Sequence, residues 1–186
     1  MGTETTTNLG LIMPDADEPA FNYPVQHTTN MEILDTIVVA PLSPASANDG
    51  TTLSFSSTSF LVGSPVVGFT FVAGPSGKVW ASIGGLIQAP NNTFGTYLCF
   101  VLRAGASIGS GTVIAAASNA TCLYAGDGVV TDGPAWASGT RRKLITGLTP
   151  GNTFNIRAEH RTTGGAAGNR VFERELSIEH VIEVPA

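Results

Sequence analysis

Residues 153–161 read Thr-Phe-Asn-Ile-Arg-Ala-Glu-His-Arg (TFNIRAEHR), and this stretch decides the fold class. Apolar or ring-bearing side chains recur at every second position, at Phe154, Ile156, Ala158 and His160. Successive side chains of a β-strand point to opposite faces, so a period of two predicts a strand with one face in a core and one polar face.

The same alternation continues in residues 170–184. One face would hold Phe172, Leu176, Ile178, His180, Ile182 and Val184, and the other Glu173, Glu175, Glu179 and Glu183. The residues between the two strands, 162–169 (TTGGAAGN), are typical of a turn. The pattern therefore predicts a terminal β-hairpin in which arginines of the first strand face glutamates of the second.

Further short apolar stretches, separated by glycine and proline, precede this pair. The predicted strands are 60–62, 66–72, 79–88, 97–103, 113–117, 141–145, 153–161 and 170–184. No helix of normal length separates them, which favours antiparallel pairing. We predict an all-β fold: an antiparallel jelly-roll-type β-sandwich, preceded by an extended N-terminal arm and one short helix.

The N-terminal quarter has a different pattern, so we predict an arm plus helix over residues 1–45 and a β-sandwich domain over 46–186. Residues 2–23 have no apolar period and are rich in threonine, acidic residues and proline. Thr29 and Glu32 have the spacing of a capping box, which predicts a helix over 29–38. Residues 42–50 (LSPASANDG) are interpreted as a linker.

Large apolar side chains are spaced along this N-terminal segment although it is too small to bury a core of its own. They are Leu9, Leu11, Ile12, Met13, Phe21, Tyr23, Val25, Ile33, Leu34, Ile37 and Val38. A helix of two to three turns is marginal in water without a partner. We expect these residues to anchor the chain on another protein, with disorder as the alternative.

Composition limits the classes of function. Charged residues make up 12% of the chain, about half the roughly 25% of a typical globular domain, and mean hydropathy is +0.20. No apolar stretch approaches the length of about 18 residues that a membrane-spanning helix needs, so we expect no membrane insertion. The low charge content is explained if much of the surface is either covered by other subunits or made of glycine, serine, threonine and alanine, and we expect self-association. A net charge of −5 argues against binding of nucleic acid.

Two cysteines, Cys99 and Cys122, lie in or beside apolar segments. Both a disulfide and two buried thiols fit this placement. We expect no secretory signal, since Met1 is followed by a polar, threonine-rich stretch. Nothing else marks an oxidising compartment, so buried free thiols are the prediction.

Residues for chemistry are sparse, and we predict no catalytic, cofactor or metal site. The histidines His27, His160 and His180 lack any metal-ligand spacing, although the last two fall on apolar faces of strands expected to be neighbours. Trp136 lies in a Gly- and Asp-rich segment, residues 126–139, interpreted as a loop. It is the candidate contact for a surface ligand.

Two stretches carry a resemblance to known families. Residues 9–15 (LGLIMPD) with 30–37 (NMEILDTI) resemble the opening of tailed-bacteriophage virion proteins, in which an arm leads into a short helix. Residues 144–157 (LITGLTPGNTFNIR) resemble a turn-and-strand of fibronectin type III domains and of phage sandwiches with a tumour-necrosis-factor-like trimeric jelly roll. Phe154 replaces the usual fibronectin tyrosine, which favours the trimeric version.

The resemblance implies a non-enzymatic phage structural protein, a homotrimer that decorates the capsid or forms a head fibre. The arm would bind capsid or tail proteins, and the chain, made in the bacterial cytoplasm, would reside on the virion. A minor tail or receptor-binding tail protein, which would contact a host-surface glycan, is the alternative. A further alternative is a carbohydrate-binding module with Trp80, Trp136 and Tyr97 as its aromatic platform.

Overall fold

The structure, a computed structural model, describes residues 4–5, 12–13, 45–91, 93–126, 133–165 and 167–182. Contacts divide the chain into two units, residues 1–43 and 44–186. In the first unit, β1 (Glu4–Thr5) pairs antiparallel with β2 (Ile12–Met13). The predicted helix over 29–38 lies outside the described residues.

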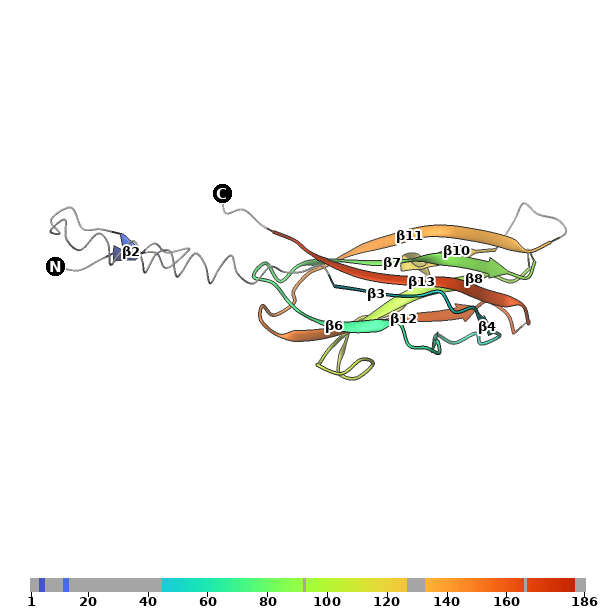
Figure 1. Cartoon of the computed structure of the whole chain (residues 1–186), viewed down its shortest axis with the longest axis horizontal. Coiled ribbons are helices and arrows are strands. Elements are labelled where there is room, and N and C mark those ends of the chain that lie inside the picture. The colour runs from blue at the N-terminus through green and yellow to red at the C-terminus, as the bar shows by residue number, and fades with distance from the viewer. Residues whose placement is uncertain are drawn as a thin grey trace. The chain divides into compact units, whose positions relative to one another are not determined.

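The second unit is a sandwich of two antiparallel sheets (Figure 1). One sheet has five strands, which are β3 (Ala45–Asp49), β4 (Leu53–Phe55), β7 (Val79–Ala89), β11 (Ala135–Ile145) and β13 (Asn169–His180). The other has six, which are β5 (Leu61–Val62), β6 (Gly68–Val72), β8 (Thr96–Ala104), β9 (Val113–Ala115), β10 (Leu123–Ala125) and β12 (Thr153–Thr162). One 3-10 turn, η2 (Asn119–Thr121), precedes β10.

The strand order is that of a jelly roll. In the five-stranded sheet it is β11-β7-β13, with β3 and β4 sharing the far edge of β13. In the six-stranded sheet it is β8-β12, with β9 and β10 on the free edge of β8 and β5 and β6 on that of β12. β3 with β4, β5 with β6, and β9 with β10 each share one edge of a neighbouring strand, so each couple counts as one position and the chain has eight positions in sequence order. The first position pairs with the eighth, the second with the seventh, the third with the sixth and the fourth with the fifth, which is the pairing of a jelly roll. The predicted all-β, antiparallel jelly-roll sandwich is confirmed.

The core lies between the two sheets and consists of side chains at alternate positions of the strands. The centre of β7 shows this pattern, because Val79, Ala81, Ile83, Ile87 and Ala89 are all fully buried. From β12, Phe154, Ile156 and Ala158 face the same core, as their alternation predicts. Among the described residues, no helix has the length and apolar character to cross a membrane.

The predicted terminal hairpin is wrong. β12 and β13 belong to different sheets, so residues 163–168 connect across the sandwich. The facing pairs of arginine and glutamate expected between these strands therefore do not form. The alternation of both strands was sound, but a two-layer core accepts an inward face from either sheet, and sequence cannot distinguish the two placements.

A register shift in β13 between Val171 and Glu173 also changes which side chains face the core. A bulge adds one residue to one strand and reverses the alternation beyond it. Val171 therefore faces the core before the shift, and Arg174, Leu176 and Ile178 face it afterwards. Phe172, predicted to be internal, lies on the outer face instead.

The predicted linker over 42–50 is wrong as well, since Ala45–Asp49 forms β3 and pairs with β13. Its sequence, ASAND, alternates alanine with polar residues over too few positions to predict a strand, although Ala45 and Ala47 do pack against the core. Its pairing partner, rather than its own pattern, makes it a strand.

Candidate functional site

The outer face of the five-stranded sheet contains a polar hollow of about 470 Å³. Gly85 of β7 and Gly139 of β11, which are register partners, line it with their backbones. Ser138 and Thr140 line it from β11, and Glu173, Arg174 and Glu175 from β13, while Asn48, Asp49 and Gly50 close the third side. The volume lies within the range of small-molecule sites, roughly 300–1,000 Å³.

Two aromatic side chains lie close in sequence to residues that line this hollow, although neither lines it itself. Trp136 lies two residues before Ser138, and Phe172 immediately precedes Glu173. Their rings stack with centroids 5.0 Å apart and planes inclined by 23°. Because β11 and β13 both pair with β7, the two rings meet over β7 beside the hollow. Trp136 keeps 53% of its surface exposed, so the stacked pair presents an accessible aromatic surface.

Trp136 was predicted to lie in a loop, and that part of the prediction is wrong. It is the second residue of β11 and pairs with Gln88 of β7. Strand placement holds the indole in a defined position on the sheet, as a binding surface requires. No part of the structure tests the predicted ligand contact itself.

Arg174 lies beneath the hollow with only 1% of its surface exposed. Its Nη2 donates to Asp49 Oδ2 at 2.6 Å, and its Nη1 donates to the carbonyl oxygen of Pro65 at 2.8 Å. Hydrogen bonds from Thr51 are the main cause that lowers the pKa of Asp49, and the charge of Arg174 lowers it further. Arg174 neutralises the charge of Asp49, whereas the carboxylates of Glu173 and Glu175 give the hollow a negative charge.

The interior beside Arg174 also contains His160. Burial, and secondly the positive charge of Arg174, lower the pKa of His160 to about 4. The ring contacts Phe55 with centroids 4.2 Å apart. His160 is therefore a neutral, packed side chain at neutral pH.

The sequence suggested that His160 and His180 could be neighbours, but the structure separates them. His160 is near the C-terminal end of β12 and contacts Phe55, whereas His180 ends β13 and contacts Phe71. The strands lie in opposite sheets. No group of three or more metal-ligating side chains occurs in the described part of the chain.

The far end of the same outer face has a second aromatic group. Arg142 of β11 lies over the ring of Trp80, with its guanidinium carbon 4.6 Å from the ring centroid, and it pairs with Glu179 of β13. Tyr97, the third residue of the aromatic platform considered for a carbohydrate-binding module, lies on the other sheet. Its ring contacts that of Tyr124 in a tilted arrangement, with centroids 4.6 Å apart, and lies under Arg161. The three aromatic residues thus do not form one platform.

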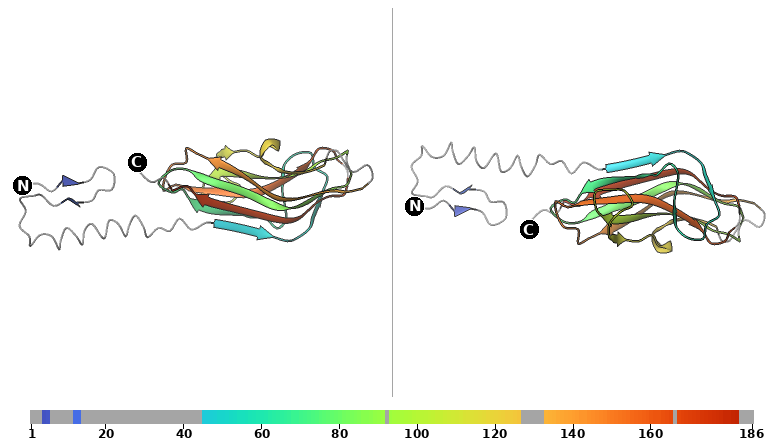
Figure 2. Two further views of the ribbon diagram at one scale, coloured as in Figure 1. Left: turned by 90° about the horizontal axis from the view of Figure 1, so that it is seen from above. Right: turned by 90° about the horizontal axis from the view of Figure 1, so that it is seen from below.

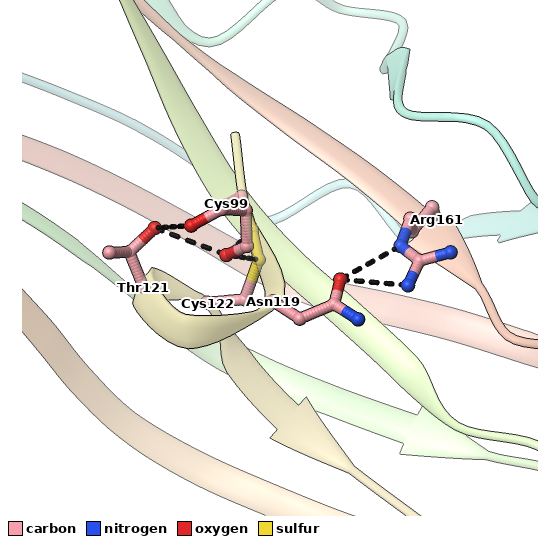
Figure 3. The surroundings of a disulfide bond; sticks show 6 residues. Cys99, Asn119, Thr121, Cys122 and Arg161 are labelled. Carbon is pink, nitrogen blue, oxygen red and sulfur yellow. Dashed lines mark hydrogen bonds between the residues drawn. A yellow bond between two sulfur atoms is a disulfide. The ribbon is translucent and has the colours of Figure 1, made fainter. Parts of the chain in front are cut away.

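Cys99 and Cys122 form a disulfide, so the expectation of free thiols is wrong (Figure 3). The antiparallel register pairs Leu98 with Leu123, which places the two cysteines opposite each other with Cα atoms 4.4 Å apart. That separation is typical of a non-hydrogen-bonded cross-strand pair. Sequence spacing alone could not reveal the pairing, because β10 is only three residues long and was not predicted.

Polar contacts surround the disulfide in Figure 3. The carbonyl oxygen of Ser118 lies 3.0 Å from Sγ of Cys122, a close contact rather than a hydrogen bond because a bonded sulfur carries no proton. Asn119 accepts from Nη2 of Arg161 at 2.7 Å. The disulfide thus fastens the segment containing η2 to the outside of the six-stranded sheet.

Of the predicted anchoring residues, Ile12 and Met13 form β2. The other predicted anchoring residues lie outside the described part of the chain; these are Leu9, Leu11, Phe21, Tyr23, Val25, Ile33, Leu34, Ile37 and Val38. Their role stays a prediction. Phe172, Glu173 and Arg174 were not predicted as site residues. The available signal was Arg174, an arginine at a position where the alternation of β13 predicts a buried apolar side chain.

Comparisons with known proteins give a limited result, since no protein-family model and no curated protein matches the chain. The solved structures similar to it include the infectious bursal disease virus VP2 subviral particle, with a TM-score of 0.36, 17% identity, and coverage of 73% of this chain and 32% of that chain. Two others are the Gt strain of that virus, with a TM-score of 0.29 at 16% identity, and its T13 viral particle, with 0.30 at 17%. Each of these two matches covers 73% of this chain; the first covers 32% of the Gt strain chain, and the second covers 30% of the T13 particle chain.

The chain spans about a third of the length of these capsid proteins. At such identities and TM-scores the likeness supports no inference about the role of the chain. Its fold class rests on the strand pairing described above.

Proposed function

We propose that this chain is a non-enzymatic structural protein of a bacteriophage particle, a homotrimeric capsid decoration or head-fibre protein. Residues 1–45 would attach it to the particle, and the jelly roll would be displayed outward. Jelly rolls are common in viral capsid proteins, although a fold alone does not specify a function.

The observation that carries the proposal is the direction in which the chain enters and leaves the jelly roll. Ala45, the first residue of β3, pairs with Ile178 near the end of β13. The chain therefore joins and leaves the jelly roll at the same end, as Figure 2 also shows. At the opposite end, Phe55 pairs with Asn169, and Trp136 with Gln88. A body connected at one end leaves the other free for display.

Exposed apolar side chains support self-association. Several large ones in the described part of the chain belong to the six-stranded sheet or the loops that flank it, namely Leu61, Val66, Val72, Ile108, Val113 and Ile114. Their grouping fits a contact between subunits, which would also explain the low charge content. Three copies are inferred from the resemblance to trimeric phage jelly rolls.

Attachment would use the apolar side chains between Leu9 and Val38. In a trimer, binding of one arm holds the other two close to their own sites and so raises their effective concentration there. The overall affinity then exceeds that of a single arm. A minor tail protein would use the same device at a different location. The number of copies per particle separates the two locations, because a capsid decoration protein is present in many more copies than a tail protein.

The test is a binding assay with purified particles that lack this protein. The full chain should bind to saturation, whereas a chain that starts at Pro44 should fold, as its own core allows, but fail to bind. In the full chain, Ile33→Asp with Ile37→Asp should abolish binding, while Thr5→Asp with Thr7→Asp controls for added charge. Full occupancy by the truncated chain would contradict the proposal. A native mass other than three times the chain mass of 19.1 kDa would contradict the trimer.

A further inference from the structure

The geometry of the five-stranded sheet points to a binding site for a neutral pyranose sugar, formed by the Trp136–Phe172 pair and the adjoining polar hollow. This inference goes beyond the virion role and does not depend on it, because all of its residues belong to the jelly roll. A sugar ring would stack on the exposed indole of Trp136, while its hydroxyl groups bond to the walls of the hollow.

The aromatic pair supplies the first half of the site. Strands that flank a common neighbour are about 10 Å apart, so only large side chains can meet over β7 as Trp136 and Phe172 do, with centroids 5.0 Å apart. The stack packs the indole against Phe172 and leaves about half of the surface of Trp136 exposed. One face of a pyranose consists of C–H groups, which match the electron-rich face of an aromatic ring.

The hollow supplies the second half, with groups that can both donate and accept hydrogen bonds. Ser138 and Thr140 offer hydroxyl groups from β11, Asn48 offers an amide, and Glu173 offers a carboxylate. A carboxylate accepts at two oxygens and can bond to neighbouring sugar hydroxyls. Glu173 directly follows Phe172 in the chain, so this carboxylate is the one that lies nearest in sequence to the aromatic pair.

The strand register places Trp136 and the polar residues of the hollow in neighbouring rows on the outer face of the sheet. Trp136, Gln88 and Arg170 form one row across β11, β7 and β13, and Ser138, Leu86 and Glu173 form the next. Adjacent rows on one face are about 7 Å apart along a strand, which is comparable to the width of a sugar ring. Gly85 contributes only backbone to the hollow: its φ is +159°, and an added Cβ would lie 2.1 Å from the carbonyl oxygen of Glu173 and 3.0 Å from the buried side chain of Leu98, so no larger residue fits there.

Charge selects a neutral sugar over an acidic one. Glu173 and Glu175 face the hollow, and the guanidinium of Arg174 is engaged by Asp49 and Pro65. Two exposed arginines lie one row from the hollow on this face: Arg170, beside the row of Glu173, and Arg142, which is paired with Glu179, beside the row of Thr140. An anionic sugar would therefore meet two carboxylates inside the hollow, with arginines only outside it. A cationic ligand would suit the carboxylates, but it would leave the hydroxyl and amide groups unused.

The experiment presents the full-length protein to an array of immobilised neutral galactosides, glucosides, mannosides and N-acetylglucosaminides. Sialyllactose, heparin and an oligolysine peptide serve as competing charged probes. Isothermal titration then measures the dissociation constant for the best neutral sugar. Trp136→Ala and Glu173→Gln should each weaken that binding at least about tenfold, with unchanged circular dichroism. Trp80→Ala, a matched substitution at the other end of the same sheet face, should leave it unchanged.

Four outcomes would overturn the inference. These are no saturable binding to any neutral sugar on the array, exclusive binding to a charged probe, equal affinity in Trp136→Ala, and loss of the native oligomer in Trp136→Ala. The last outcome would identify the aromatic pair as a contact between subunits. If Trp136→Ala fails to fold, Glu173→Gln provides the same test, because it changes a surface group without altering the core.

Discussion

The ion pair between Arg174 and Asp49 gives the sharpest test of how this jelly roll is stabilised. Replacing Asp49 with alanine removes the carboxylate 2.6 Å from Nη2 of Arg174 and leaves the guanidinium one hydrogen bond, to Pro65. The side chain of Arg174 is 1% exposed, so solvent replaces the lost partner only in part. An uncompensated buried charge is among the few changes that destabilise a protein strongly.

The magnitude follows from the burial of the two partners. Breaking a buried ion pair by removing one side costs about 3–5 kcal/mol. The side chain of Asp49 is 14% exposed at the edge of the hollow, where water can partly screen the remaining charge. We therefore expect Asp49→Ala to lower the free energy of unfolding by about 3 kcal/mol, the lower end of that range.

Arg174→Met should cost less, about 1–2 kcal/mol. It removes the buried charge and keeps an apolar stem, and Asp49 keeps the hydrogen bond from the backbone N–H of Thr51 at 3.0 Å. The double variant should then be more stable than the sum of the two losses predicts. A coupling energy of about 2 kcal/mol is expected for partners in direct contact.

The assay is urea unfolding of the full chain at fixed protein concentration and pH 7.5, followed by tryptophan fluorescence and circular dichroism. Glu175→Ala serves as the control, because this carboxylate also lines the hollow but is exposed. It should change stability by no more than about 0.5 kcal/mol. A loss below about 1 kcal/mol for Asp49→Ala, or a coupling energy near zero, would refute this account of Arg174.

Two further predictions concern the disulfide and His160. Replacing Cys99 and Cys122 by serine opens a covalent loop across a separation of 23 residues and should lower the free energy of unfolding by about 3 kcal/mol; unchanged urea midpoints with and without reductant would contradict this. The pKa of His160, about 4 in the folded chain, lies below the usual value of about 6.5, so the unfolded chain binds more protons between these values. Stability should fall by about 2 kcal/mol from pH 7.5 to pH 5 and by about 1 kcal/mol more to pH 4, and this contribution should level off below about pH 3. His160→Gln should reduce that slope, leaving any contribution of His180, whose pKa burial also lowers; an unchanged slope would show that His160 is not the cause.

Local alternation in the sequence predicted the long strands well. β7, β8 and β12 begin and end within a residue or so of the predicted bounds, because each carries a regular apolar face that the core requires. β3, β4 and β10 were missed, and all three are short strands at sheet edges. An edge strand needs only a partner for its backbone, so its side chains carry little signal.

The candidate site depended on information that no short stretch contains. Trp136 stood out in the sequence as an isolated aromatic residue, but its neighbour Phe172 was assigned to the core. Their stacking requires that β11 and β13 both pair with β7 and that β13 shifts register at Phe172. The pairing of Cys99 with Cys122 likewise requires the register of β10 on β8.

The sequence by itself determined the class of this protein: strands with one apolar face, joined by glycine and proline turns, must form a two-layer antiparallel sandwich. It also determined that the N-terminal residues differ from the rest, since their apolar side chains follow no period. Only the tertiary structure decided which sheet each strand joins, where β13 bulges, and which polar side chains gather beside Trp136. The physical reason is that periodicity is a local property of one strand, whereas register and sheet membership minimise the free energy of the whole core at once.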